Sequence, residues 1–400
     1  MNYPDPYLGG LSLKYINYNF GIERALYKDL IVSVNYVGNL GSNLVLSGAR
    51  GYYNNSSPLQ YLALGPIPTT TNAKASILTQ PVSNSAALAT AQAMFPGLTV
   101  DPTFPTSQTI EQLTRPFPQY SKISDTYEAL GTTNYNAMQL TFAKRAPFHG
   151  LTWNLNYTWD KAMDDVENYR NGYEPLRAEW SPSQTDIPNY LTVYAVYDLP
   201  AGRGHLVGGD NPFLDAIVGG WRTTGVFFYS SGYALQVTTS GCNTGDTGGT
   251  CIPNLTPGYS GSPRVHGGYG SHVTAATLGT TQYLDPTAFT TPSTFTFGNA
   301  PTTAPYHLYG PGDHDLDLSV RREFPIMPEG KAKFIFRMDV FNVPNNVIFG
   351  GLTTSLTAKA NTQQNTPIIT YAPSTTASFG TFTSQANHQR DIQFAGRIEF

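Results

Sequence analysis

Apolar and polar side chains alternate along several short stretches of the chain. In residues 150–160, GLTWNLNYTWD, apolar or aromatic residues occupy every second position, with Thr, Asn or Asp between them. The closing residues, DIQFAGRIEF, show a similar period and end on Phe400. A period of two is typical of a β-strand whose two faces meet different surroundings. We therefore expect strands with one apolar and one polar face.

Nine stretches follow this pattern, most of them about ten residues long, which suits a tilted strand that crosses a bilayer. They are Leu11–Ile22, Ile31–Val37, Tyr135–Arg145, Gly150–Asp160, Tyr190–Leu199, Trp221–Ser231, Asp313–Phe324, Lys331–Phe341 and Asp391–Phe400. The faces of Trp221–Ser231 stay unassigned, because Phe227 and Phe228 are adjacent. Lys122–Leu130 is a candidate for a further strand. The pattern predicts an all-β chain of about nine or ten strands.

The polar faces carry charge along their length, which excludes them from a protein core. In residues 313–324, Asp313, Asp315, Asp317, Arg321 and Glu323 share one face. Buried unpaired charges are costly, so such a face must meet water. The opposite faces carry aromatic residues toward their ends, as at a membrane interface. Only helices or closed barrels satisfy the backbone in lipid, and no stretch of eighteen apolar residues occurs. The sequence therefore predicts an antiparallel transmembrane β-barrel.

The predicted strands are joined by connections that alternate in length. The long connections are Ser47–Thr133, Ala162–Asp186, Ser240–Gly312 and Asn342–Asn387. In outer-membrane barrels the long loops are extracellular and the periplasmic turns are short. We expect the chain to end in the periplasm, with a short helix at the periplasmic rim in PFLDAIVGG, within Pro200–Gly220. Bacterial barrels have even strand numbers, so nine strands imply one further strand in the chain or strands before Met1.

Composition and net charge argue against a nucleic-acid-binding protein and bear on the compartment. Charged residues are 12% of the chain, against about 25% in soluble domains. The net charge of −4 offers no basic surface to nucleic acid. The start, MNYPDPYLGG, lacks the basic and apolar regions of a signal peptide. We therefore expect the N-terminal part of a longer protein to be missing, rather than a cytoplasmic location.

The two cysteines, Cys242 and Cys251, lie in the Gly-rich stretch SGCNTGDTGGTCIPN. A disulfide that closes this short loop is the favoured interpretation and would fit an oxidising compartment. Free thiols are the alternative. A metal site would need further His or Cys nearby, and none is close in sequence.

Candidate chemistry is sparse. Asp313, Asp315 and Asp317 could bind a cation, but carboxylates two apart on a strand lie almost 7 Å from one another, so a lumen wall is the favoured interpretation. In AMDDVEN, the residues Asp164, Asp165 and Glu167 suggest either a solvated acidic rim or a calcium loop. No GxSxG, HExxH or GxxxxGK[ST] motif occurs. We predict no enzyme activity, cofactor or metal.

Aromatic residues in the predicted loops suggest a binding surface. Tyrosines set among Asn, Ser and Gly resemble surfaces that bind sugars or peptides, although loop self-packing is the simpler explanation. They are Tyr52, Tyr53, Tyr61, Tyr259, Tyr269, Tyr283, Tyr306 and Tyr309.

An ordered series of motifs resembles one family. The motifs are YINYNFGIERALYKDLIVSVNYVGNLGSNL, LQYLALG, LTQPV, LTRPFPQY, NYNAMQLTFAKRAPFHGLTWNLNYTWDKAMDD, GWRTTGVFFYSSGYALQV, YGPGDHDLDLSVRREF, FRMDVFNVPNNVIFG and RIEF. Together they resemble the C-terminal barrel of TonB-dependent outer-membrane receptors. The closest likeness is to the Oar-like subgroup, whose members carry an N-terminal carboxypeptidase-regulatory-like domain.

The resemblance implies that residues 1–400 are the C-terminal segment of a larger barrel in the outer membrane of a Gram-negative cell. A signal peptide, a plug domain and the first barrel strands would precede it. It also implies that the TonB complex acts through the plug, that the transported ligand is large (a siderophore, carbohydrate or peptide), and that Phe400 is the signal read by the barrel-assembly machinery. Two alternatives are a secreted all-β adhesin or surface protein and a small stand-alone porin.

Overall fold

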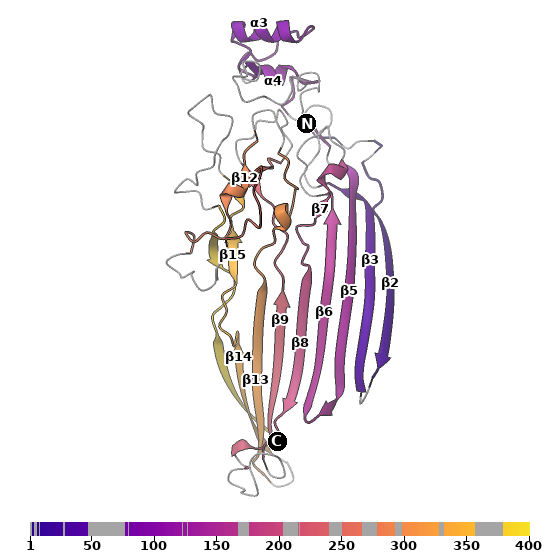
Figure 1. Cartoon of the computed structure of the whole chain (residues 1–400), viewed down its shortest axis with the longest axis vertical. Helices are drawn as coiled ribbons and strands as arrows, with labels where there is room; N and C mark the ends of the chain where they lie inside the picture. The colour runs from indigo at the N-terminus through magenta and orange to yellow at the C-terminus, as the bar shows by residue number, and fades with distance from the viewer. Residues whose placement is uncertain are drawn as a thin grey trace.

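The protein is dominated by one large antiparallel sheet (Figure 1). The computed structural model describes residues 2–3, 6–7, 9–26, 29–46, 77–78, 80–121, 123–125, 127–166, 176–202, 215, 217–239, 250–265, 278–292, 298–327, 332–356 and 379–400. Nine long strands form a continuous path in the order β18-β14-β13-β9-β8-β6-β5-β3-β2, and the short β7 pairs only with β6. None of the helices in the described ranges has the length and apolar character needed to cross a membrane.

The nine long strands coincide with the nine stretches predicted from alternation. They are β2 (Lys14–Ala25), β3 (Leu30–Val45), β5 (Ala129–Phe148), β6 (Leu151–Asp164), β8 (Asn189–Asp198), β9 (Trp221–Ser230), β13 (Asp313–Pro325), β14 (Lys333–Phe341) and β18 (Asp391–Glu399). The further strand of the sheet is β7 (Ser181–Pro182). The candidate stretch Lys122–Leu130 contains the two-residue strand β4 (Ser124–Asp125), which pairs with β1 (Asn2–Tyr3) outside the large sheet, and its last two residues begin β5. Lys122 and Thr126 lie outside the described residues.

Short connections gather at one end of the sheet, where the chain also terminates (Figure 1). The β5–β6 turn consists of His149 and Gly150, both with positive φ (50° and 85°). Two such residues make the type I′ turn that matches the twist of a hairpin. A Cβ on Gly150 would lie 2.5 Å from the Asp198 carbonyl oxygen, so glycine is required there. In the β8–β9 connection, Asp215, Ile217 and Val218 are helical, in agreement with the predicted rim helix.

The other end of the sheet carries long connections with short elements of their own. In the β3–β5 connection, α3 (Ser85–Met94) and α4 (Ile110–Leu113) form what we call the helical unit. The 3-10 helices are η2 (Leu176–Glu179), η3 (Pro286–Ala288) and η4 (Pro305–His307). The short strands are β1 (Asn2–Tyr3), β4 (Ser124–Asp125), β10 (Thr238–Thr239), β11 (Asn254–Leu255), β12 (Phe289–Thr290), β15 (Phe349–Leu352), β16 (Ser355–Leu356) and β17 (Phe382–Gln385).

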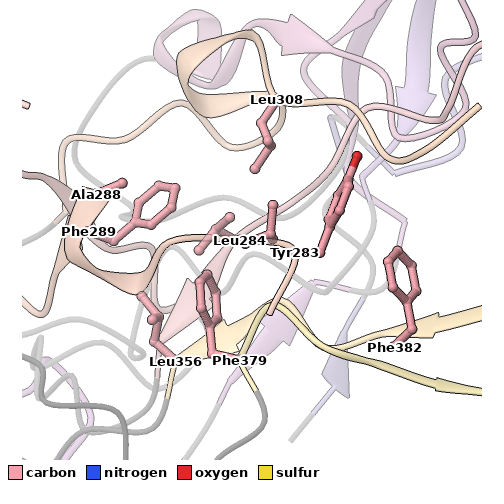
Figure 2. Packing of buried hydrophobic residues seen from close by; sticks show 9 residues of the cluster. Tyr283, Leu284, Ala288, Phe289, Leu308, Leu356, Phe379 and Phe382 are labelled. Carbon is pink, nitrogen blue, oxygen red and sulfur yellow. The ribbon is translucent and has the colours of Figure 1, made fainter. Parts of the chain in front are cut away.

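Two separate apolar cores lie within these connections and not in the sheet. The loop core draws Val237, Leu308, Leu356 and Phe382 together from the β9–β13 and β14–β18 connections (Figure 2). The helical unit has a core of its own, which includes Ala91 and Ile110. The sheet itself is covered on neither face by a second layer of described strands. Its two faces must therefore find their surroundings elsewhere.

Candidate functional site: the two faces of the sheet

The register of the strands places apolar side chains in rows on one face. Directly paired residues of antiparallel strands share a face. One row runs from β3 to β13 and consists of Val32, Phe142, Leu155, Val193, Phe227 and Leu316. Phe20 on β2 and Phe394 on β18 belong to the same face and are 67% and 69% exposed. A face this apolar and this extensive is not stable against water, so it requires hydrocarbon.

The register also assigns the two faces of β9, which the sequence pattern left unassigned. Phe227 belongs to the apolar row, whereas Phe228 lies on the opposite face between Thr192 and Asp315. There its ring meets Tyr190 edge to face at 5.1 Å. The opposite face is thus mainly polar but includes an aromatic contact.

Elsewhere the opposite face, which we call the polar wall, carries hydroxyl, amide and charged groups. A representative row across β2, β3, β5, β6 and β8 is Glu23, Ser33, Thr141, Asn156 and Thr192. Within it the Thr141 hydroxyl donates to Asn156 Oδ1 at 3.0 Å. Asp313, Asp315 and Asp317 lie on this wall, where the prediction of a water-facing surface put them.

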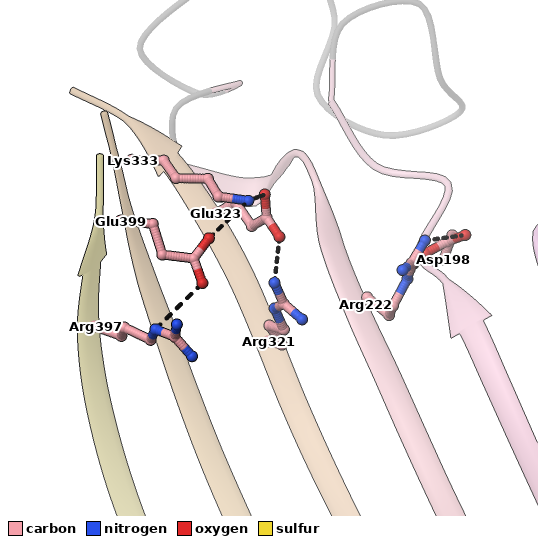
Figure 3. A network of polar contacts seen from close by, with 7 residues as sticks. All are labelled: Asp198, Arg222, Arg321, Glu323, Lys333, Arg397 and Glu399. Carbon is pink, nitrogen blue, oxygen red and sulfur yellow. Dashed lines mark hydrogen bonds and ion pairs between the residues drawn. The ribbon is translucent and has the colours of Figure 1, made fainter. Parts of the chain in front are cut away.

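Ion pairs concentrate on the polar wall at the end with short connections (Figure 3). Arg222 donates to both carboxylate oxygens of Asp198, at 2.5 and 3.2 Å. The Lys333 ammonium bridges Glu323 and Glu399 at 3.0 and 3.1 Å. Exposed pairs of this kind contribute about 0–1 kcal/mol each. These ion pairs therefore determine the distribution of charge at this end of the wall but contribute little to the stability of the fold.

Three arginines lie directly opposite one another within this network. Arg321 on β13 pairs in register with Arg222 on β9 and with Arg337 on β14. Arg397 on β18 lies diagonally from Arg337, because it pairs with Ile335. We call these four residues the arginine row. They line a hollow of about 450 Å³ that also contacts Ser319. Like charges directly opposite are destabilising on a sheet.

A fifth arginine lies on the apolar face, where only its two terminal nitrogens are hydrogen-bonded. Arg322 pairs with Trp221 and Phe336, and only 7% of it is exposed. Its guanidinium donates to the carbonyl oxygens of Ile217 (2.5 Å) and Asp215 (3.1 Å) in the rim helix. It also lies 4.5 Å from the centre of the Phe324 ring. A charge at the edge of the apolar face is thereby paired with backbone dipoles and aromatic rings.

At the end with long connections, buried carboxylates tie loops to the wall. Asp186 is 1% exposed and accepts from the Ala162 N–H (2.6 Å) and the Tyr309 hydroxyl (2.7 Å). Burial and the hydrogen bond to Asp186 raise the pKa of Tyr309. Glu179 is also buried and accepts from the Thr302 hydroxyl. The connections after β6 and β9 are therefore anchored to each other and to the sheet.

The acidic group in AMDDVEN belongs to this anchoring. Asp164 and Asp165 are 6% and 4% exposed, so the prediction of a solvated rim is wrong for them. Asp165 accepts from both the N–H and the hydroxyl of Thr132, at 2.6 and 2.8 Å, which explains why the carboxylate is buried. Glu167 lies outside the described residues. Within the described part of the chain, no group of three His, Cys, Asp or Glu side chains could hold a metal ion.

The loop tyrosines that the structure describes pack within the loops. Tyr283 belongs to the loop core (Figure 2), and Tyr306 packs against Tyr259 with ring centres 5.4 Å apart. The Tyr259 hydroxyl donates to Asp285 at 3.1 Å; burial, followed by this bond, raises the pKa of Tyr259 to about 12. Self-packing therefore accounts for these residues. Tyr52, Tyr53, Tyr61 and Tyr269 lie outside the described residues.

Two predicted features of the chain remain predictions. Cys242 lies outside the described residues, and Cys251 is not a free thiol. Phe400 follows β18 and is 99% exposed. It continues the alternation of Phe394 and Ile398, which extends the apolar face to the last residue. This position suits the expected assembly signal.

Comparison with known families agrees with the geometry of the two faces. The model of the outer membrane beta barrel domain matches residues 12–393, which include eight of the nine long strands in full and the start of β18. The chain belongs to the outer membrane beta barrel domain family. As a member, it is an outer-membrane protein whose apolar rows face lipid and whose polar wall lines the inside of a partial barrel. The long connections are extracellular, and the ion-pair end is periplasmic.

The solved structures that match this chain are of longer proteins. They are the FpvAI–pyocin S2 complex (10% identity, TM-score 0.35), FpvA of P. aeruginosa bound to heterologous pyoverdines (10%, 0.36) and the outer membrane transporter YddB of Escherichia coli (9%, 0.38). Each match covers 96% of this chain but only 27%, 26% and 32% of the other chain, respectively. The chain thus spans about a quarter to a third of their length. A search of curated proteins finds no match.

Proposed function

We propose that the chain is the C-terminal segment of the barrel of a TonB-dependent outer-membrane receptor of the Oar-like subgroup, which moves a large ligand across the outer membrane. The observation that carries the proposal is the open sheet. Neither β2 nor β18 has a second neighbour in the sheet among the described strands. Unpaired backbone groups at a sheet edge are not tolerated in lipid, so further strands must cover both edges.

The direction of the edge strands specifies what those further strands must be. All neighbours along the path are antiparallel, so the first and ninth strands, β2 and β18, run in the same direction. Direct closure between them would be parallel. Closure that is antiparallel throughout needs an odd number of additional strands, which gives the even total typical of bacterial barrels. This favours a larger barrel over a stand-alone porin.

The soluble adhesin does not fit the two faces. Its strands would bury their apolar faces against a second sheet, whereas Phe20, Trp159 and Phe394 are exposed. In the proposed receptor, a plug domain encoded upstream fills the lumen and receives energy from the TonB complex. The ligand is a siderophore, carbohydrate or peptide held by extracellular loops and plug together.

Heat-modified mobility tests the larger barrel. The chain would be expressed alone and together with any reading frame directly upstream, and outer membranes would be run unheated and heated on a detergent gel. We expect the compact, faster-migrating form of a closed barrel only with the upstream segment. A compact form from residues 1–400 alone would refute the proposal.

Two further measurements test the receptor itself. Uptake or release of the ligand should stop in cells that lack the TonB complex, and continued transport there would refute energy coupling. Removal of Phe400 should lower the amount of assembled barrel in the outer membrane, with Ile326→Ala in the β13–β14 turn as a control that leaves the terminus intact.

A further inference from the structure

The arginine row is the strongest concentration of positive charge on the polar wall that the structure describes. Around it, five cations (Arg222, Arg321, Arg337, Arg397 and Lys333) face four carboxylates (Asp198, Glu323, Asp339 and Glu399). The side chains of these ion pairs thus carry one more positive than negative charge, although the whole chain carries −4. A positive surface in an acidic chain attracts anions specifically to this place.

The ion pairs leave most of the donors of these arginines unused. Arg337 and Arg397 contact their partners through the Nε atom only, and the side chains are 55% and 76% exposed. Arg222 and Arg321 are 57% and 44% exposed. Each guanidinium carries five N–H donors in a fork that suits carboxylate oxygens. Arg321, Arg337 and Arg397 each pair with the carboxylate two residues further along the same strand, and Arg222 pairs across to β8. All four arginines line the hollow with N–H donors to spare.

The spacing of the arginines fixes the shape of the anion. Neighbouring strands lie about 4.8 Å apart, so the row from β9 to β18 spans roughly 14 Å. A single carboxylate or phosphate reaches one or two guanidiniums. An extended peptide places alternate side chains about 6.8 Å apart, and three of them cover the same span. The hollow of about 450 Å³ is large enough for such side chains.

We propose that the arginine row binds an extended polypeptide segment that lies across β9, β13, β14 and β18 inside the periplasmic end of the lumen and presents acidic side chains at alternate positions. Its carboxylates add to those of the wall in offsetting the repulsion between arginines that are directly opposite. This inference rests on the proposed function only in taking the polar wall as the side of a lumen.

Binding of a defined peptide to the purified barrel in detergent, assembled with any upstream segment that closure requires, tests the inference. The probe is fluorescein-labelled Thr-Glu-Thr-Glu-Thr-Glu-Thr, followed by fluorescence anisotropy, with the same peptide carrying Gln for Glu as the control. We expect the Glu peptide to bind, the Gln peptide not to bind, and the affinity to fall as salt is raised, because exposed charges are screened.

Variants locate the site. The double variant Arg321→Gln/Arg337→Gln should weaken Glu-peptide binding by about tenfold or more, because it removes charged donors from the centre of the row. Arg397→Gln, at the most exposed position of the row, should give a smaller loss with the least risk to folding. Arg390→Gln neutralises an exposed arginine at the extracellular end of β18 and should change nothing.

Three results would overturn the inference. The first is absence of Glu-peptide binding, and the second is binding by the Arg397→Gln and double variants that is as tight as binding by the unchanged protein. The third is displacement of the peptide by citrate at the same concentration as by unlabelled peptide. The last result would reduce the row to a site for small anions. None of them bears on heat-modified mobility or TonB dependence, so failure here is distinct from failure of the proposed function.

Discussion

An arginine introduced at mid-membrane should lower the free energy of unfolding much more on the apolar face of the sheet than on the polar wall. Val193 and Thr192 are neighbours on β8; Val193 pairs with Leu155 and Phe227, and Thr192 pairs with Asn156 on the polar wall. Val193 lies five residues from Asp198, the periplasmic end of β8. With a rise of about 3.3 Å per residue and a tilt of about 40°, it lies roughly 13 Å from that end. This is close to the middle of an apolar band about 25 Å tall.

The size of the effect follows from this depth. Arginine on the lipid face at the midplane costs about 2–4 kcal/mol, which is roughly 30- to 800-fold in the folding equilibrium. Val193→Arg should lose this amount. Thr192→Arg places the same side chain at almost the same depth but in the aqueous lumen, and it should lose less than about 1 kcal/mol.

Urea titration of the barrel in phospholipid vesicles, followed by tryptophan fluorescence, measures both variants against the unchanged chain. The barrel is assembled with any upstream segment that closure requires. Equal losses for the two variants, or a larger loss for Thr192→Arg, would show that the faces are assigned the wrong way round.

Three further perturbations concern the extracellular loops. Phe289→Ala, at a position that is 1% exposed in the loop core, should cost about 3–5 kcal/mol and expose the loops to protease without changing heat-modified mobility of the barrel. The folded-state pKa of Tyr259 is raised from 10 to about 12, so the loops bind this proton more tightly than the unfolded chain does. Loop stability should therefore fall as pH rises from 10 to about 12, and Tyr259→Phe should reduce that slope in protease-protection assays; an unchanged slope would contradict this assignment. Replacement of Cys251 by Ser should remove a difference in gel mobility between reduced and non-reduced protein, and Cys242→Ser should have the same effect if the two are paired.

The strands and their faces were predictable because each face meets a uniform medium. Lipid on one side and water on the other impose a period of two, which is visible in the sequence of each strand separately. The ends of the strands were less predictable. β3 and β5 contain 16 and 20 residues, longer than the predicted Ile31–Val37 and Tyr135–Arg145. Beyond the membrane the strands continue with Asn, Gly and Thr, which alternate without contrast between apolar and polar.

The polar contacts could not be predicted from the sequence for a different reason. The arginine row depends on which residue of β9 faces which residue of β13 and β14, and no single strand specifies that register. Asp165 looks like a solvated acid until Thr132, 33 residues earlier in the sequence, supplies the donors. Sequence could have drawn attention to Arg322, a charge among apolar positions. Its partners in the rim helix belong to another connection and could not be inferred.

The loop core has a consequence for biogenesis. Its closing residues, Phe379 and Phe382, are synthesised shortly before the terminal strand, whereas Val237 and Leu308 emerge much earlier. Until these two residues have been synthesised, Val237 and Leu308 lack their partners and their apolar surface stays uncovered. A nascent or truncated chain would therefore need a chaperone for its loops as well as for its strands. The loop core can form only after the residues that precede the terminal strand have been synthesised.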